Sequence, residues 1–95
     1  MNAATVKSAL IEVVKDIQIS SGYDGSGVSG DICPLKDLPG FDSMICTEAT
    51  SMLSSTLGLV IADDANIFVS ENGKRLLTID EAAAVVCERL SRGET

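Results

Sequence analysis

The sequence predicts an all-α domain, a small four-helix bundle made of three long helices and one short one. Two observations predict this fold. Apolar residues recur at intervals of three and four along three separate stretches of the chain, which is the pattern of a helix with one buried face. The chain has 95 residues, enough for a single domain over residues 1–95, and helices of this kind must bury their apolar faces against one another.

The first stretch predicts an amphipathic helix over about residues 4–19, with its charged residues off the apolar stripe. The stripe consists of Val6, Ala9, Leu10, Val13, Val14 and Ile17. From Ser20 to Phe41 the periodicity ends, and five glycines and two prolines predict a long surface loop, which Ile32, Leu35 and Leu38 pin to the domain. A loop this long in a compact domain is usually functional or crosses between non-adjacent elements.

The second stretch predicts a helix over about residues 43–59, with Asp42 as its N-cap. Its apolar residues are Met44, Met52, Leu53, Leu57, Val60 and Ile61. Ser43 therefore lies in the first turn, where backbone N–H groups have no helical partner. A phosphate esterified on Ser43 would face these groups and the positive end of the helix dipole, which favours an anion by roughly 0.3–1 kcal/mol.

A short third helix is expected over about residues 64–68, where Asp63 or Asp64 can act as the cap. It is followed by the segment Val69–Leu77, in which Asn72-Gly73 lies between apolar residues. Asn-Gly in this setting is a hairpin signal, so the sequence favours a small two-stranded excursion here.

The last helix is expected over about residues 79–91. It opens with Thr78-Ile79-Asp80-Glu81, which fits a capping box. In a capping box the hydroxyl and the carboxylate each accept a hydrogen bond from the other residue's backbone N–H group.

Composition limits the classes of partner. Seven Lys and Arg residues against fourteen Asp and Glu residues leave a net charge of −7. Nucleic acid and anionic membranes are therefore poor partners, and basic protein surfaces are good ones.

No apolar stretch is long enough to span a bilayer, so we expect no membrane insertion. The chain contains no histidine, and Ser43 has no evident base, so we expect no triad hydrolase and no enzyme.

The cysteines give no sign of a metal site. Cys33, Cys46 and Cys87 are odd in number, lack a C-x-x-C spacing and have no histidine beside them. We interpret them as reduced thiols of a cytoplasmic protein. Charged residues also interrupt every apolar run near the N-terminus, so no secretion signal is expected there.

The residues around Ser43 resemble a known family. With Glu48 five residues after the serine and Leu53 five residues after that, the segment Asp42-Ser43-Met44 resembles the acyl carrier proteins. The resemblance covers about residues 35–90 and is most specific over residues 42–61. It implies the same four-helix bundle that the apolar pattern predicts.

The resemblance also implies a function. In that family a phosphopantetheinyl transferase moves 4'-phosphopantetheine from coenzyme A to the serine, and the thiol of this arm carries an acyl group as a thioester. By resemblance, Ser43 is the attachment point, Asp42 helps present it to the transferase, and Met44 lies beside the arm. The expected partners are the transferase and the enzymes that load and use the acyl group, and we expect a monomer.

Two features depart from the family. The segment Val69–Leu77 is longer than the usual connection at that place. From Ser43 to Ile61 the chain has seven Ser and Thr residues and one charged residue, Glu48, whereas fatty-acid carriers typically have many acidic residues there. These departures predict a specialised, free-standing carrier that serves a dedicated biosynthetic pathway.

Several residues keep two interpretations. Glu48 is a candidate docking contact, and it is equally an ordinary solvated helix residue. Ile61, Ile67 and Phe68 are candidate walls of an acyl pocket, and as apolar residues they also fit a plain core. The alternative to a carrier is an unmodified acidic helical interaction module that shares the fold.

Overall fold

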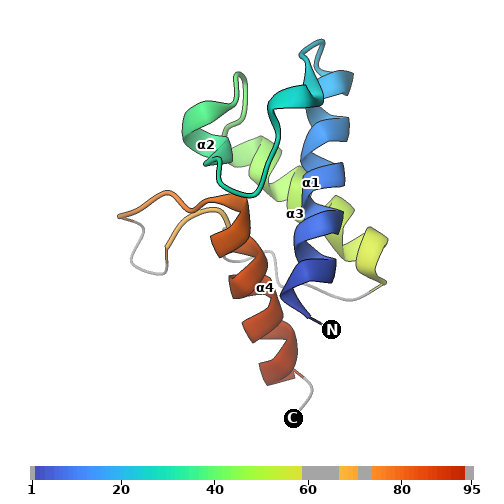
Figure 1. Cartoon of the computed structure of the whole chain (residues 1–95), viewed down its shortest axis with the longest axis vertical. Coiled ribbons are helices and arrows are strands. Elements are labelled where there is room, and N and C mark those ends of the chain that lie inside the picture. The colour runs from blue at the N-terminus through green and yellow to red at the C-terminus, as the bar shows by residue number, and fades with distance from the viewer. Residues whose placement is uncertain (1, 59–66, 71–73, 94–95) are drawn as a thin grey trace.

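The computed structural model describes residues 2–58, 67–70 and 74–93, with side chains as far as Glu88. Four α-helices lie in these residues: α1 (Ala3–Ser20), α2 (Pro34–Asp37), α3 (Ser43–Leu57) and α4 (Ile79–Gly93). A 3-10 turn, η1 (Gly25–Gly27), precedes α2. Helix α1 contacts α3, α4 and η1, so the bundle is organised around it (Figure 1). The predicted all-α bundle with three long helices is confirmed, and the short helix found in the described residues is α2 rather than the one predicted over 64–68.

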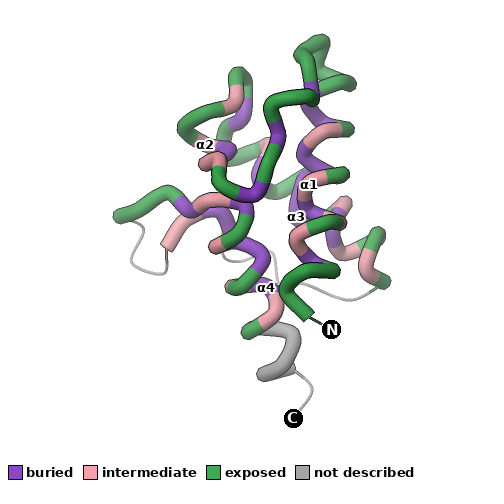
Figure 2. The backbone as a smooth tube through the Cα atoms, viewed as in Figure 1, coloured by how far each residue is buried: buried purple, intermediate pink, exposed green. Residues whose placement is uncertain are grey.

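The buried face of α1 matches the predicted stripe. Five residues of the predicted stripe are at most 5 % exposed, and Ala9 packs beside them. The five are Val6, Leu10, Val13, Val14 and Ile17. Buried residues of α1, α3 and α4 line a common interior, while the chain between α1 and α2 is mainly exposed (Figure 2).

The buried face of α3 differs from the predicted one. Met44 is 81 % exposed, and Met52 and Leu57 are only partly buried. The residues that α3 buries are Cys46, Ala49, Thr50 and Leu53. Small and polar residues form most of this face because α3 packs directly against α1, and the Thr50 hydroxyl satisfies its hydrogen bond by donating to the Cys46 carbonyl at 2.9 Å. The helix ends at Leu57 rather than at 59, because Gly58 adopts a left-handed conformation with φ +68°.

The expectation of an irregular loop from Ser20 to Phe41 is corrected in part, because η1 and α2 lie within it. Helix α2 starts at Pro34, and the Asp37 carboxylate accepts a hydrogen bond from the Cys33 N–H group at 2.8 Å. Four residues are too few to show helical periodicity in a sequence.

In the predicted short helix at 64–68, residues 64–66 lie outside the described residues, and Ile67 and Phe68 form a turn.

The described ends of the predicted hairpin pair with each other, although the described residues contain no strand. Val69 and Leu76 form an isolated antiparallel bridge, and the Ser70 N–H group donates to the Arg75 carbonyl at 2.9 Å. The Asn72-Gly73 turn lies outside the described residues.

The start of α4 is capped twice. The predicted capping box is confirmed, since the Thr78 N–H group donates to Glu81 at 3.0 Å and the Glu81 N–H group donates to the Thr78 hydroxyl at 3.1 Å. In addition, the N–H groups of Ile79 and Asp80 donate to the carbonyls of Ile32 and Gly30, at 3.0 and 2.8 Å. The long loop is therefore hydrogen-bonded to α4. None of the helices in the described part is long and apolar enough to cross a membrane.

The Glu81 carboxylate links the hairpin to α4 and makes stability depend on pH. Arg75 lies 2.7 Å from it, and the hydrogen bond from Arg75, followed by that from the Thr78 N–H group, lowers the pKa of Glu81 from 4.5 to about 2. A depressed pKa stabilises the fold above the unfolded value, and this contribution disappears as the pH falls from about 4.5 towards 2.

We therefore expect the melting temperature of the wild type to fall more steeply than that of Glu81→Gln between pH 5 and pH 2. Glutamine retains the cap to Thr78 but does not titrate, so the variant isolates the charge. Thermal unfolding followed by circular dichroism measures this difference. Parallel curves for the two proteins would contradict the contribution of the ion pair.

Candidate functional site

Ser43 is the first residue of α3 and its side chain is exposed, as the sequence predicts. Asp42 is confirmed as the N-cap, because its carboxylate accepts a hydrogen bond from the Ile45 N–H group at 3.0 Å. The Asp42 carbonyl accepts from the Cys46 N–H group at 2.9 Å. Ser43 therefore lies between a capped turn and solvent.

The electrostatic surroundings of Ser43 favour an anion. Within the described part of the chain, the backbone N–H groups of Ser43 and Met44 donate no hydrogen bond. These groups point out of the N-terminal end of α3, where the helix dipole is positive. A phosphate ester on the Ser43 hydroxyl would lie within reach of both effects.

The exposed face of α3 continues from Ser43 and carries almost no charge. Met44 is 81 % exposed and Glu48 is exposed further along the helix. The other exposed residues on this side are polar and uncharged: Thr47, Ser51 and Ser55. Shape, apolar contact and hydrogen bonds are what this face offers to another protein.

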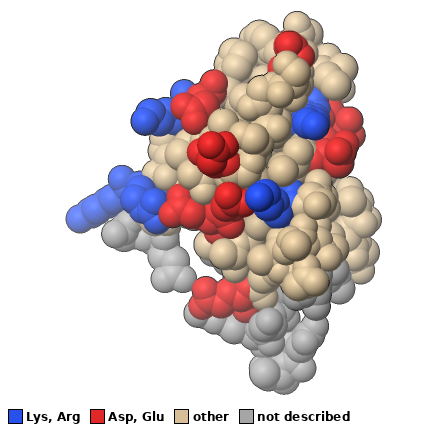
Figure 3. All heavy atoms as spheres, in the orientation of Figure 1, with Lys and Arg blue, Asp and Glu red and all other residues tan. Residues whose placement is uncertain are grey.

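Two ion pairs lie elsewhere in the described residues, although acidic side chains outnumber basic ones in the chain by fourteen to seven. On the face that Figure 3 shows, the basic side chains lie beside acidic ones, and further acidic side chains lie apart from any basic side chain. Lys7 pairs with Asp80 at 3.0 Å, which joins α1 to α4, and Arg75 pairs with Glu81. In the described residues no group of three or more His, Cys, Asp or Glu side chains is arranged to hold a metal ion.

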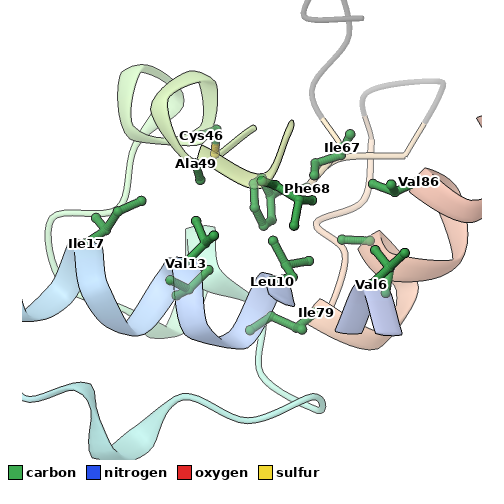
Figure 4. Packing of buried hydrophobic residues seen from close by; sticks show 14 of the residues in the cluster. Val6, Leu10, Val13, Ile17, Cys46, Ala49, Ile67, Phe68, Ile79 and Val86 are labelled. Atoms are coloured by element: carbon green, nitrogen blue, oxygen red, sulfur yellow. The ribbon is translucent and has the colours of Figure 1, made fainter. Parts of the chain in front are cut away.

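The candidate acyl-pocket residues lie in the core where they are described. Ile67 and Phe68 are fully buried, and Phe68 lies among residues of α1 and α3 (Figure 4). The Phe68 ring meets the edge of Phe41, with ring centres 5.4 Å apart and planes at 76°. Ile61, the third candidate, lies outside the described residues.

The segment Pro39–Asp42, which leads into Ser43, is held at every residue. The Gln18 amide donates to the Pro39 carbonyl at 3.4 Å, and the Tyr23 ring lies against Gly40. The Phe41 ring is buried against Phe68, and Asp42 caps α3.

Sequence reasoning did not find Gln18 or Tyr23. A signal for Gln18 existed, because this polar residue lies four and eight positions after Val14 and Leu10 and so continues the buried stripe of α1. Tyr23 gave no such signal, since its contact with Gly40 depends on the path of the loop.

Comparison with known proteins brings no relative to the chain: no protein-family model matches it, and neither a curated protein nor a solved structure does. The candidate site therefore depends on its residues and their geometry.

Substitutions at Gly40 and Gly58 distinguish the cost of backbone strain from the cost of a clash with a neighbouring side chain. Both have positive φ, +71° and +68°, but a Cβ atom on Gly40 would lie 3.2 Å from the Tyr23 ring, and one on Gly58 would have no described atom within 4 Å. We expect Gly58→Ala to lower the free energy of unfolding by about 1 kcal/mol through backbone strain, since no described atom would meet its Cβ. Gly40→Ala should cost more.

Chemical denaturation measures both variants. Tyr23 is the only tyrosine and the chain has no tryptophan, so its fluorescence reports displacement of the ring. The signal should change in Gly40→Ala and remain as in the wild type in Gly58→Ala. Equal stability of the two variants with unchanged fluorescence in both would contradict the contact.

Proposed function

We propose that this protein is a carrier whose Ser43 hydroxyl is esterified with 4'-phosphopantetheine, and which presents acyl thioesters to the enzymes of a dedicated pathway. The observation that carries the proposal is the position of Ser43. It is exposed at the first residue of α3, directly after the Asp42 cap and beside backbone N–H groups without a partner in the described part. The resemblance of Asp42-Ser43-Met44 to the acyl carrier proteins supplies the chemistry.

The modification itself would be catalysed by another protein. A phosphopantetheinyl transferase, with magnesium in its own site, would join the Ser43 oxygen to the phosphorus next to pantetheine while the pyrophosphate bond of coenzyme A breaks. Adenosine 3',5'-bisphosphate would leave, and the proton of the Ser43 hydroxyl would pass to a base of the transferase. The chain has no histidine to act as a base, and the Asp42 carboxylate is engaged as the cap. We therefore propose a substrate and carrier rather than an enzyme. Its three free thiols fit a reducing compartment such as the cytoplasm.

The cargo would be limited by the core. A short acyl chain that entered the domain would have to separate Ile67 and Phe68 from their neighbours, because both are fully buried. Such an opening has a cost in packing, so we propose that the arm holds its acyl group mainly outside the domain unless a chain of suitable shape displaces these residues.

Mass spectrometry tests the modification. When the protein is co-expressed with a transferase of broad specificity, the wild type should gain the mass of one phosphopantetheine arm. Ser43→Ala should gain none and should retain the wild-type melting temperature, since the Ser43 side chain is exposed and Asp42 still caps α3. Asp42→Asn keeps the cap without the charge, and so measures whether the transferase uses the carboxylate.

Two results would contradict the proposal. One is an arm on Ser43→Ala, which would place the attachment elsewhere. The other is a wild-type protein that stays unmodified with several transferases, which would favour the unmodified interaction module.

The exposed face of α3 predicts how binding depends on salt. Glu48 is the one charged residue between Ser43 and Leu57, so transferase binding should weaken by less than about threefold from low to moderate salt. Adding charge with Ser51→Glu and Ser55→Glu, both at exposed positions, should make binding more sensitive to salt.

The matched control is Ser51→Gln with Ser55→Gln, which has similar side chains without charge. Binding is measured by titration at several salt concentrations. A steep salt dependence of the wild type would show instead that acidic residues outside α3 steer the partner. Asp37 is one exposed candidate for that role.

A further inference from the structure

We infer that Gln18, in the last turn of α1, and Tyr23, in the loop just after it, are positioning residues that hold the segment Pro39–Asp42 and so fix the orientation in which Ser43 meets the modifying enzyme. This inference rests on the proposed function, because it concerns the same serine. It adds two residues that touch neither Ser43 nor the phosphopantetheine arm.

Gln18 occupies a position where an apolar residue would be expected. Its side chain is 2 % exposed and belongs to the buried face of α1. The amide nitrogen donates to the Pro39 carbonyl at 3.4 Å, while the amide oxygen is buried without a partner in the described part. Rotating the amide by half a turn would set its oxygen against the Pro39 oxygen, so the observed orientation is the favourable one.

A buried acceptor without a partner destabilises the folded state. Methionine has nearly the same shape and would avoid this cost. The presence of glutamine here is therefore poorly explained by stability, and its one described side-chain hydrogen bond ends on the segment that leads to Ser43. Residues that lower stability without a structural benefit are found preferentially at functional sites.

The Tyr23 ring, which is 43 % exposed, lies beside the next residue of the same segment. Its N–H group donates to the Gln18 carbonyl at 2.8 Å, so the two residues are fixed to each other. A Cβ on Gly40 would lie 3.2 Å from the Cε2 atom of Tyr23 and 3.4 Å from its hydroxyl oxygen. The glycine thus allows the ring to lie directly over the backbone, three residues before Ser43.

These contacts affect the orientation of the Ser43 hydroxyl rather than its exposure to solvent. Phe41 and Asp42 anchor the segment to the core and to α3, Gln18 anchors it to α1, and Tyr23 contacts it from the loop after α1. Without the contacts from Gln18 and Tyr23, α3 would still form and would still expose Ser43. The hydroxyl would sample more orientations, and transfer depends on the fraction of time it is aligned with the phosphorus.

Gln18→Met tests the inference in a steady-state assay of phosphopantetheine transfer from coenzyme A. We expect kcat to fall about five- to tenfold while KM stays near that of the wild type, because the exposed face of α3 is unchanged. The melting temperature should be equal to or above that of the wild type, since an unsatisfied buried acceptor is removed.

Tyr23 supplies a second pair of variants. Tyr23→Ala removes the ring over Gly40 and should lower kcat in the same way. Tyr23→Phe retains the ring and should restore most of the rate. The control is Val86→Ala, a fully buried residue of α4, which should lower the melting temperature and leave kcat unchanged.

The outcomes distinguish the inference from the function on which it rests. If the wild type is modified and Gln18→Met and Tyr23→Ala are modified at the wild-type kcat, the positioning role is wrong and the carrier function stands. If kcat follows the melting temperature across all variants, Val86→Ala included, the effect is general stability and the inference is again wrong. If the wild type is never modified, both fall.

Discussion

The buried stripe of α1 is the constraint on which the other elements depend, because α1 contacts α3, α4 and η1. Val6, Leu10 and Val14 are fully buried, and burial of one such side chain contributes about 1.5–3 kcal/mol. In a domain of 95 residues the net stability is only several kcal/mol, so this one helix face decides whether the bundle forms. Its last buried residue, Gln18, belongs to the same face and connects the core to the segment before Ser43.

The long crossover between α1 and α3 is a structural part of the bundle. Its carbonyls at Gly30 and Ile32 accept the first N–H groups of α4, and its final segment, Pro39–Asp42, enters α3. The salt bridge between Lys7 and Asp80 joins α1 to the same end of α4. The length of the loop follows from this path, since it must reach the start of α4 before it returns to α3.

The candidate site combines an anchored segment of backbone with an exposed hydroxyl group. Phe41 and Asp42 are anchored on the two sides of the turn, by the Phe68 ring and by the Ile45 N–H group, and Ser43 follows in solvent. The proposed modification of Ser43 would need this arrangement, because exposure gives access and anchoring limits the orientations of the hydroxyl. The uncharged surface of α3 beside it is suited to recognition by shape and hydrogen bonds.

The features that the sequence alone determined are local ones. The stripe of α1, the Asp42 cap and the Thr78–Glu81 box each depend on residues three or four positions apart, and the structure confirms all three. Ser43 and its place in the first turn follow from the same local rules. Interactions over such distances are set by backbone geometry, so they are visible in the order of residues.

Only the tertiary structure decided the rest. Which face α3 buries, with Met44 outside and Cys46 inside, depends on the position of α1. The bond from Gln18 to Pro39 joins residues 21 positions apart, and the caps from Gly30 and Ile32 to α4 span still longer separations. Such contacts arise when the helices pack, because burial of the apolar faces brings together polar groups whose meeting no local pattern specifies.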